Sequence, residues 1–365
     1  MLVIIDHVEG YRNDVGVYSH WSNAAVPLLG QLGVTLFFVL SGFLITYLLL
    51  AEKEKLGQIK IWDFYVRRAL RIWPLYYVVV GLGLFILPHV WWLDYPKLTG
   101  HSTDHLVGKI FFYGLMLPNV ARELYLPIPY LSQAWSIGVE EQFYLFWPWV
   151  IHFGRRYLWL LAGLALFFTI AIQLPWLITS PNHKWVVNSP AWDFLKHLLA
   201  ALRIQSMCIG GIFAVLLYFR YSKLLRIIQA PPVQFMGWIV AVVLIVRGQQ
   251  FGAITFEIYS VVFGLLILNL ADTAHSVISL QGTVFNYLGK ISYGLYMLHG
   301  LAMTISFRAV QAVMTNDSSL FHQGVMYIFT LVGSVLLAGL SYRYLESPFL
   351  KYKKLFIRVN SGAPV

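Results

Sequence analysis

The chain has 365 residues, of which 59% are hydrophobic and 12% are charged. Water-soluble domains carry about 25% charged residues, so this composition excludes a soluble globular protein. The net charge of +10 does not indicate nucleic-acid binding, because the Lys and Arg residues stand in short clusters between apolar runs rather than along a soluble face.

Apolar runs recur along the whole chain and predict an all-α polytopic membrane protein with a single membrane-embedded domain, residues 1–365. A run of about 18 or more apolar residues can cross a bilayer as one helix. We expect full spans, in chain order, at Leu32–Leu50, Ile72–Val90, Ala134–Phe153, Tyr157–Ile178, His197–Phe219, Val233–Val246, Ile254–Leu270, Phe285–Phe307 and Val325–Tyr342.

The segment Met1–Glu9 is expected to add a partial span before these. At about 1.5 Å per residue it covers less than half of a ~30 Å hydrocarbon core, so the first helix looks truncated. Either the natural chain begins upstream of Met1, or the protein has a helical stub here.

Basic clusters set the expected topology. They run from Lys53 to Arg71, at Arg155–Arg156, from Arg220 to Arg226 and from Arg343 to Arg358. The positive-inside rule places all of them in the cytoplasm. The spans then alternate correctly if Lys109–Val120, which is short for a span, is a re-entrant or interfacial segment. We expect about ten spans in the cell membrane, with both termini cytoplasmic.

Two early stretches are candidates for the site. His7 follows Asp6 in the partial span, and a histidine can give and take protons near neutral pH. An isolated histidine can equally be structural. Ser41 and Gly42 are small residues in an otherwise bulky helix, where they could line a cavity or permit close helix packing.

Arg68 and Arg71 precede an apolar run and are three residues apart. On a helix they share one face and could hold one anion between them. Guanidinium groups suit phosphate because their donors form a planar fork. The alternative is an ordinary positive-inside cluster.

Adjacent carboxylates, Glu140 and Glu141, fall inside a predicted span. A charge there costs at least ~2.5–3.5 kcal/mol, so it normally faces a cavity or a partner. The alternative is a structural ion pair with an arginine. The same stretch supplies further candidate cavity-lining residues, which are Trp135, Ser136 and Tyr144.

A later stretch places Ser292, Tyr296 and His299 on one helical face. A polar stripe in a membrane helix points inward, where it could line a cavity or form interhelical hydrogen bonds. No spacing among the histidines indicates a metal site.

In this order, the stretches resemble the acyltransferase 3 family of membrane-bound O-acyltransferases. The resemblance runs from His7 to the closing Tyr344-Leu345-Glu346-Ser347-Pro348-Phe349. It implies about ten membrane helices and transfer of an acyl group, commonly acetyl, from cytoplasmic acyl-CoA to a hydroxyl of a cell-surface glycan, a lipid-linked sugar or a similar acceptor. Acyl-CoA is then a substrate, and no bound cofactor or metal is implied.

The resemblance also implies roles for single residues. His7 takes the place of the family's catalytic histidine, and Arg68 and Arg71 that of its donor-binding pair. Glu140 takes the place of a carboxylate in the central cavity, where we expect it to act in catalysis, either by holding the imidazole tautomer or by binding the acceptor. One feature departs from the family pattern, because the basic residue that usually precedes the histidine would lie before Met1. This departure leaves open a catalytically inactive relative that binds lipid or glycan. A transporter is the other alternative, although no internal duplication is visible.

Overall fold

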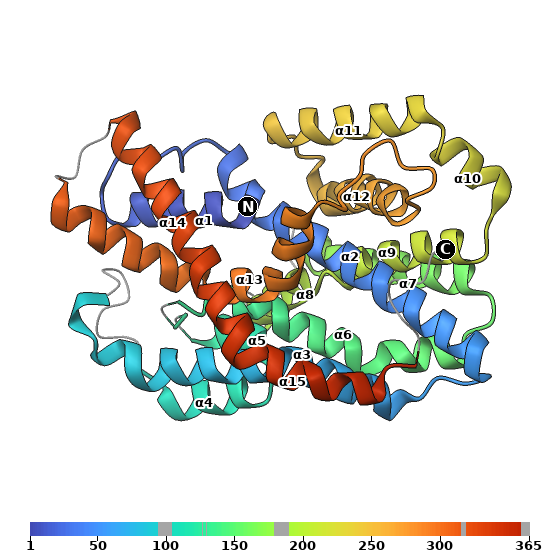
Figure 1. Cartoon of the computed structure of the whole chain (residues 1–365), viewed down its shortest axis with the longest axis horizontal. Helices are drawn as coiled ribbons and strands as arrows, with labels where there is room; N and C mark the ends of the chain where they lie inside the picture. Colours follow the sequence, from blue (N-terminus) through green and yellow to red (C-terminus); the bar gives the residue numbers. More distant parts are fainter. Residues whose placement is uncertain (94–103, 126, 129, 179–189, 315–318, 359–365) are drawn as a thin grey trace. The chain divides into compact units, whose positions relative to one another are not determined.

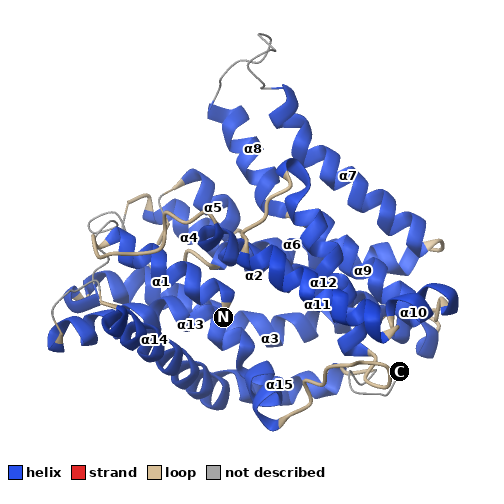
Figure 2. Ribbon diagram, turned by 90° about the horizontal axis from the view of Figure 1, so that it is seen from above, coloured by secondary structure: helices blue, strands red, loops and turns tan. Residues whose placement is uncertain are grey.

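The computed structural model describes residues 1–93, 104–125, 127–128, 130–178, 190–314 and 319–358. These residues form helices and connections without a β-strand, as Figure 2 shows. The prediction of an all-α protein is therefore confirmed. The helices are labelled in Figure 1. Contacts along the chain divide it into two compact units, which are residues 1–30, 63–138 and 281–357 in unit 1, and residues 31–62, 139–280 and 358–365 in unit 2.

Unit 1 is formed by residues 1–30, 63–138 and 281–357. Its helices are α1 (Leu2–Asp14), most of α3 (Ile61–Gly81), α4 (Leu106–Gly114), α5 (Pro118–Leu124), α13 (Thr283–Val313), α14 (Leu320–Ser341) and α15 (Ser347–Lys353). Short π-helical or 3-10 turns join them, at η1 (Leu82–Ile86), η2 (Leu87–His89), η3 (Trp91–Leu93), η5 (Tyr342–Glu346) and η6 (Lys354–Phe356).

Helix α1 is held in unit 1 by an apolar stripe. Ile4, Val8 and Tyr11 lie on one face of the helix and are buried in a cluster with α13 and α14, whose contributions are Met303, Phe307, Val310 and Met326. Because this stripe faces α13 and α14, the residues on another face of α1 are directed elsewhere. Asp6 and His7 lie on that face and line a cavity. The helix extends to Asp14, beyond the expected partial span.

A buried carboxylate ties α1 to α14 as well. Glu9 accepts hydrogen bonds from Gln323 Nε2 at 3.0 Å and from the Tyr327 hydroxyl at 2.7 Å, and it also accepts one from the backbone N–H of His20. Charge-assisted hydrogen bonds are about twice as strong as neutral ones. These contacts fix the rotation of α1 and thereby the direction of His7.

Unit 2 contains the remaining helices. These are most of α2 (Ala25–Leu56) and α6 (Ala134–Phe153), then α7 (Tyr157–Ile178), α8 (Pro190–Leu202), α9 (Ile204–Tyr218), α10 (Ser222–Ile228), α11 (Pro231–Val246), η4 (Gly252–Ile254) and α12 (Thr255–Ala271). The bounds of α6 and α7 coincide with the predicted spans. The span expected at His197–Phe219 lies, but for its last residue, within the run Pro190–Tyr218, which is long and apolar enough to cross a membrane, although Arg203, with a φ of 43°, separates α8 from α9.

Six helices or helix runs in the described part of the chain are long and apolar enough to cross a membrane. The count becomes seven if α10 and α11, which meet at a 59° bend, form one broken span. The chain is therefore a multi-pass membrane protein, but the expected ten spans are not confirmed. Helices α6 and α13 were also predicted as spans and are not among the six.

The predicted re-entrant segment, Lys109–Val120, is also not confirmed. It forms parts of two short helices, α4 and α5, that meet at a turn where Met116 has a φ of 61°. The two helices, α4 and α5, have nine and seven residues. Neither helix alone reaches across a bilayer core of about 30 Å.

Candidate active site

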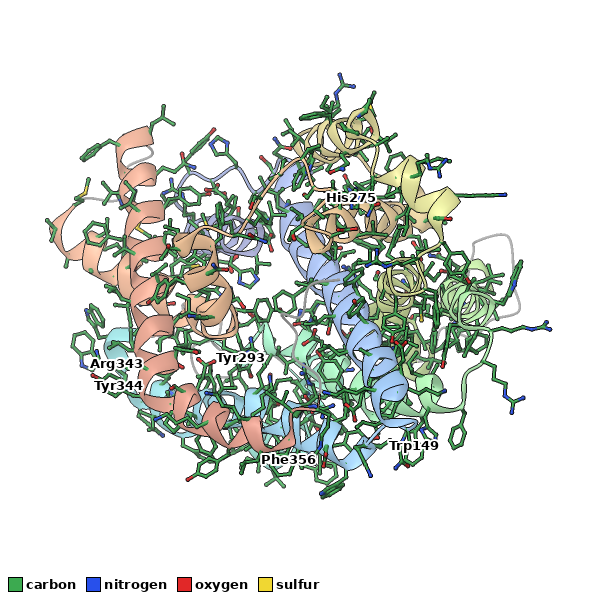
Figure 3. All side chains as sticks on the ribbon, turned by 45° about the vertical axis from the view of Figure 1, so that its right-hand side comes forward. Trp149, His275, Tyr293, Arg343, Tyr344 and Phe356 are labelled. Carbon is green, nitrogen blue, oxygen red and sulfur yellow. The ribbon has the colours of Figure 1, made fainter. Side chains whose placement is uncertain are left out.

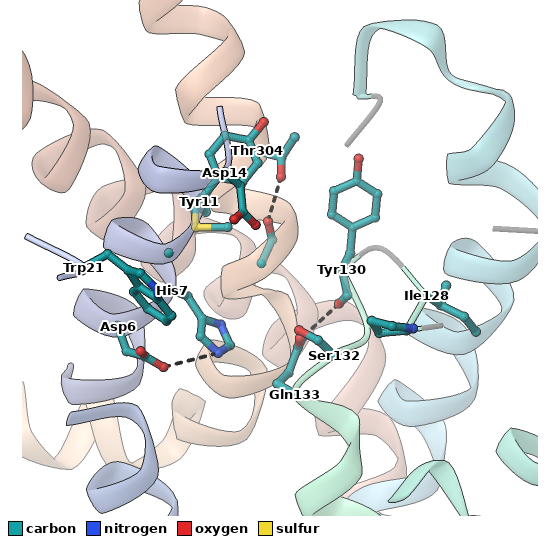
Figure 4. A pocket seen from close by; sticks show the side chains of 14 residues that line it. Asp6, His7, Tyr11, Asp14, Trp21, Ile128, Tyr130, Ser132, Gln133 and Thr304 are labelled. Atoms are coloured by element: carbon teal, nitrogen blue, oxygen red, sulfur yellow. Dashed lines mark hydrogen bonds and ion pairs between the residues drawn. The ribbon is translucent and has the colours of Figure 1, made fainter. Parts of the chain in front are cut away.

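A cavity of about 300 Å³ lies beside His7, entirely within unit 1 (Figure 4). Helix α1 supplies Asp6 and His7, the connection after α1 supplies Trp21, and the segment before α6 supplies Gln133. Helix α13 completes the wall with Gly300 and its neighbours. Segments distant in sequence thus converge on one histidine.

His7 is hydrogen-bonded to a second histidine, His299 on α13. The Nε2 atom of His299 lies 2.8 Å from the Nδ1 atom of His7, and the ring centroids are 4.8 Å apart. His299 is almost fully buried, with 1% of its surface exposed, whereas the side chain of His7 keeps 27% exposed. The exposed ring is therefore the one that can meet a ligand.

The hydrogen bonds fix which nitrogens carry protons. The Nδ1 atom of His299 lies 2.6 Å from the backbone carbonyl oxygen of Tyr296. A carbonyl only accepts, so Nδ1 of His299 carries the proton and its Nε2 is an acceptor when the ring is neutral. It follows that Nδ1 of His7 donates to His299 and that Nε2 of His7 holds an unshared electron pair. That atom is suited to act as a base or as a nucleophile.

Tyr296 anchors this pair to the start of α6. Its hydroxyl donates to the Gln133 carbonyl oxygen at 3.0 Å and lies 2.6 Å from the Ser136 hydroxyl. The polar stripe predicted for α13 thus contributes Tyr296 and His299 to the site. Ser292 instead bonds the carbonyl oxygen of Gly289 in its own helix, at 2.9 Å.

Asp6 places a carboxylate on the other side of the His7 ring. Its Oδ2 atom lies 3.9 Å from Nε2 of His7, as the dashed line in Figure 4 marks. A Cβ at Gly30 would overlap this carboxylate, so glycine is required there for Asp6 to fit. The distance exceeds that of a hydrogen bond, and the interaction is therefore electrostatic.

Arg68 and Arg71 lie on α3 and form a cationic cluster with two further residues, Arg67 and Lys353. The three guanidinium groups lie close enough to Lys353 on α15 to repel its ammonium group. Arg67 donates from Nη1 to the carbonyl oxygen of Phe356 at 2.7 Å, which ties α3 to η6; Phe356 is labelled in Figure 3. Like charges gathered in this way favour the binding of an anion.

A carboxylate, that of Glu346, faces this cluster. Glu346 is 2% exposed and lies within electrostatic reach of Arg71. Its Oε1 atom accepts a hydrogen bond of 3.0 Å from Ser341 across the π-helical turn η5. Arg343 and Tyr344 in the same turn point away from it to the outside (Figure 3). The turn therefore directs one acidic residue inward beside Arg71.

Trp135 stacks with an arginine that was not predicted to belong to the site. The guanidinium carbon of Arg122 on α5 lies 5.2 Å from the centre of the Trp135 ring, and the Arg122 charge acts on His7. Stacking of this kind is worth ~0.5–1 kcal/mol at exposed sites. Trp135 thus positions a cation rather than lining the cavity.

The remaining predicted residues lie in unit 2. The hydroxyl groups of Ser41 and Tyr144 are 2.6 Å apart and buried. A Cβ at Gly42 would overlap the backbone carbonyl of Met207, so this glycine packs α2 against α9. On α6, Glu140 is buried with 4% exposed, and Glu141 is half-buried.

Several residues of the site were missed in the sequence, among them Arg122, Gln133 and Lys353. Gln133 preceded the conspicuous Trp-Ser stretch and carried no charge to draw attention. Lys353 belonged to a basic cluster that was interpreted only as a sign of topology. The approach of α15 to Arg68 and Arg71 is a tertiary contact between segments that the sequence keeps far apart.

A family model described as an acyltransferase domain matches residues 1–342. The chain is 25% identical, over 356 residues, to the peptidoglycan O-acetyltransferase OatA of Listeria monocytogenes, an alignment that covers 92% of this chain and 54% of the relative. It is 26% identical, over 365 residues, to the O-acetyltransferase OatA of Staphylococcus aureus strain NCTC 8325, with 92% and 55% covered. The chain thus spans about half the length of these curated relatives. No solved structure matches it.

Proposed function

Since the chain belongs to the acyltransferase 3 family, we propose that it is a membrane O-acyltransferase that moves an acetyl group from cytoplasmic acetyl-CoA to a hydroxyl of a cell-surface glycan. The names of its relatives, one of them a peptidoglycan O-acetyltransferase, support acetyl as the group and a glycan as the acceptor. The observation that carries the proposal is the hydrogen bond from His7 to His299, which leaves Nε2 of His7 with its electron pair beside a cavity.

In the proposed reaction His7 is the general base. Its Nε2 atom takes the proton of the acceptor hydroxyl while the acceptor oxygen attacks the thioester carbonyl carbon. The carbon–sulfur bond then breaks and the CoA thiolate leaves, taking the proton from His7. His299 accepts a hydrogen bond from Nδ1 throughout, so the ring keeps one orientation and its transient positive charge is shared.

A covalent route uses the same atom. Nε2 of His7 could attack the thioester first and release the thiol, after which the acceptor hydroxyl would attack the acyl-histidine. The two routes differ in whether acetyl remains on the protein in the absence of acceptor. Mass measurement of the protein after brief exposure to acetyl-CoA alone separates them.

The cationic cluster on α3 and α15 is the proposed donor site. Coenzyme A carries phosphate groups, and the guanidinium forks of Arg68 and Arg71 match phosphate oxygens. Lys353 adds a third cation on a neighbouring helix. Bound phosphate would relieve the repulsion among these groups, which supports this assignment over a purely topological cluster.

The role of Glu140 stays the prediction that the family resemblance implies, because Glu140 belongs to unit 2 and the cavity beside His7 belongs to unit 1. Orientation of the His7 ring does not require it, since Nδ1 of His7 is already hydrogen-bonded to His299.

The test is release of CoA thiol from acetyl-CoA by the purified protein in detergent, with and without a glycan acceptor. Acceptor-dependent release that His7→Ala abolishes supports the proposal. Binding of acetyl-CoA without any turnover would favour the catalytically inactive relative. Glycan flux in vesicles without any use of acetyl-CoA would favour a transporter.

A further inference from the structure

The cavity beside His7 presents hydrogen-bond acceptors whose protein partners are missing. Gln133 is 2% exposed and lines the cavity. Its Nε2 atom donates to the carbonyl oxygens of Tyr130 and Met297, both at 2.8 Å. Because carbonyls only accept, these two bonds fix the amide orientation. The Oε1 atom is thereby directed away from both and has no hydrogen-bond partner among the described residues.

Space is left beside this oxygen by a glycine. A Cβ placed on Gly300 would lie 3.7 Å from Oε1 of Gln133 and 3.6 Å from the nearest atom of Tyr130. These are ordinary van der Waals distances, so alanine would fit without displacing the protein. The residue at this position on α13 therefore controls how closely a ligand can approach Oε1.

Asp6 adds a second acceptor to the same cavity. Its Oδ1 atom is buried and has no hydrogen-bond partner within the described parts of the chain. A buried polar atom without a partner is unfavourable by about 1–3 kcal/mol. Asp6 and Gln133 therefore both gain from a ligand that brings hydrogen-bond donors.

The charge of the cavity points in the same direction. Two carboxylates, Asp6 and Asp14, line it, and no Lys or Arg is among its described lining residues. Arg122, which acts on His7, is held over Trp135 and is not part of the wall. Trp21 offers an aromatic ring, the kind of surface on which the apolar face of a sugar packs. An anionic ligand would meet two carboxylates in the described wall of the cavity.

From these features we infer that Gln133 and Asp6 determine acceptor specificity, by selecting an uncharged or amino sugar with at least two neighbouring hydrogen-bond donors and rejecting acidic sugars. The inference rests on the proposed function. One donor is the hydroxyl that His7 deprotonates. The others satisfy Oε1 of Gln133 and Oδ1 of Asp6, and so hold that hydroxyl at Nε2 of His7.

The test is calorimetric binding of two oligosaccharides to the full chain in detergent, without acetyl-CoA. Chitotetraose is the neutral probe and tetragalacturonate the acidic one. We expect chitotetraose to bind at least about tenfold more tightly, because each galacturonate has an acceptor-only carboxylate in place of a hydroxyl donor and is repelled by the carboxylates of the cavity. Equal binding, preference for the acidic probe, or no binding of either by a folded sample would overturn the inference.

Variants locate the effect. Gly300→Ala should weaken chitotetraose binding about tenfold, the equivalent of one lost hydrogen bond, and leave acetyl-CoA binding unchanged. The matched control is Gly289→Ala on the same helix, where a Cβ meets nothing within 4 Å. Asp6→Asn should reduce the difference in affinity between chitotetraose and tetragalacturonate. Unchanged binding by Gly300→Ala would place the ligand elsewhere.

Failure of this inference can be distinguished from failure of the proposed function. Acetyl transfer to an acidic acceptor would overturn the specificity and leave the transferase standing. Selective binding of chitotetraose by a protein that never consumes acetyl-CoA would overturn the transferase and leave the cavity as a neutral-sugar site.

Discussion

His299 reaches His7 from a helix 292 positions later in the chain, and the two ring nitrogens are 2.8 Å apart. The contact is directional, because the backbone of Tyr296 determines the tautomer of His299 and His299 in turn determines that of His7. A buried ring thereby prepares an exposed ring for chemistry. His299 acts through His7 and is a positioning residue.

Replacing His299 by leucine should lower kcat by about 100-fold, since general base catalysis is typically worth 10²–10⁴-fold and the correct tautomer would no longer be enforced. The KM for acetyl-CoA should change little. His299→Gln, which retains an acceptor atom, should recover part of the loss. Steady-state kinetics of the two variants give kcat and the KM for acetyl-CoA separately. An equal loss of kcat in both variants, with a raised KM, would indicate a merely structural role for His299.

His7→Ala should abolish acyl transfer. Among the described residues that line the cavity, His7 is the only histidine, so no other ring nitrogen there could take its place. The side chain keeps 27% of its surface exposed, so its removal should leave the fold intact. Release of CoA thiol measures the loss of transfer, and size-exclusion chromatography shows whether the variant stays folded. Transfer at the wild-type rate would remove His7 from the mechanism.

Arg68→Ala/Arg71→Ala should weaken acetyl-CoA binding by at least about 100-fold, since hydrogen bonds to charged groups contribute ~1.5–3 kcal/mol each. Lys353→Ala should also weaken it, by about tenfold. The control is Lys351→Ala in the same helix, whose side chain is exposed. Calorimetry measures the acetyl-CoA affinity of each variant. An equal loss of affinity in Lys353→Ala and Lys351→Ala would argue against a local donor site.

Gly42→Ala should destabilise the protein by about 1–3 kcal/mol, because the new methyl group would overlap the backbone of α9. Gly163→Ala is the control, since a Cβ there meets nothing within 4 Å and alanine favours the helix. Thermal unfolding in detergent compares the two. A stable Gly42→Ala protein would show that α2 and α9 are not in backbone contact.

Ser136→Ala and Tyr296→Phe should each cost about 1 kcal/mol of stability, the net value of one hydrogen bond. Their hydroxyl groups are 2.6 Å apart. The double variant should therefore lose less than the sum of the single losses, because the shared bond is broken only once. Additive losses in the unfolding experiment would mean that the two hydroxyl groups contribute independently.

The sequence by itself determined the membrane environment, the helical fold and the bounds of α6 and α7, because these depend on local hydrophobicity, which a linear pattern records. It also placed Tyr296 and His299 on one face of a helix, since that relationship requires only helical periodicity. It indicated His7, Arg68, Arg71 and Glu140 through resemblance, and their roles stay proposals.

Only the tertiary structure decided which residues meet. The partner of His7 on α13, the unsatisfied oxygen of Gln133 and the approach of Lys353 to α3 are contacts between distant segments, and a periodic pattern holds no information about them. The same holds for Gly42, whose two interpretations were separated only by the backbone of α9. The physical reason is that a side chain's chemistry depends on its neighbours in space, which helix packing selects.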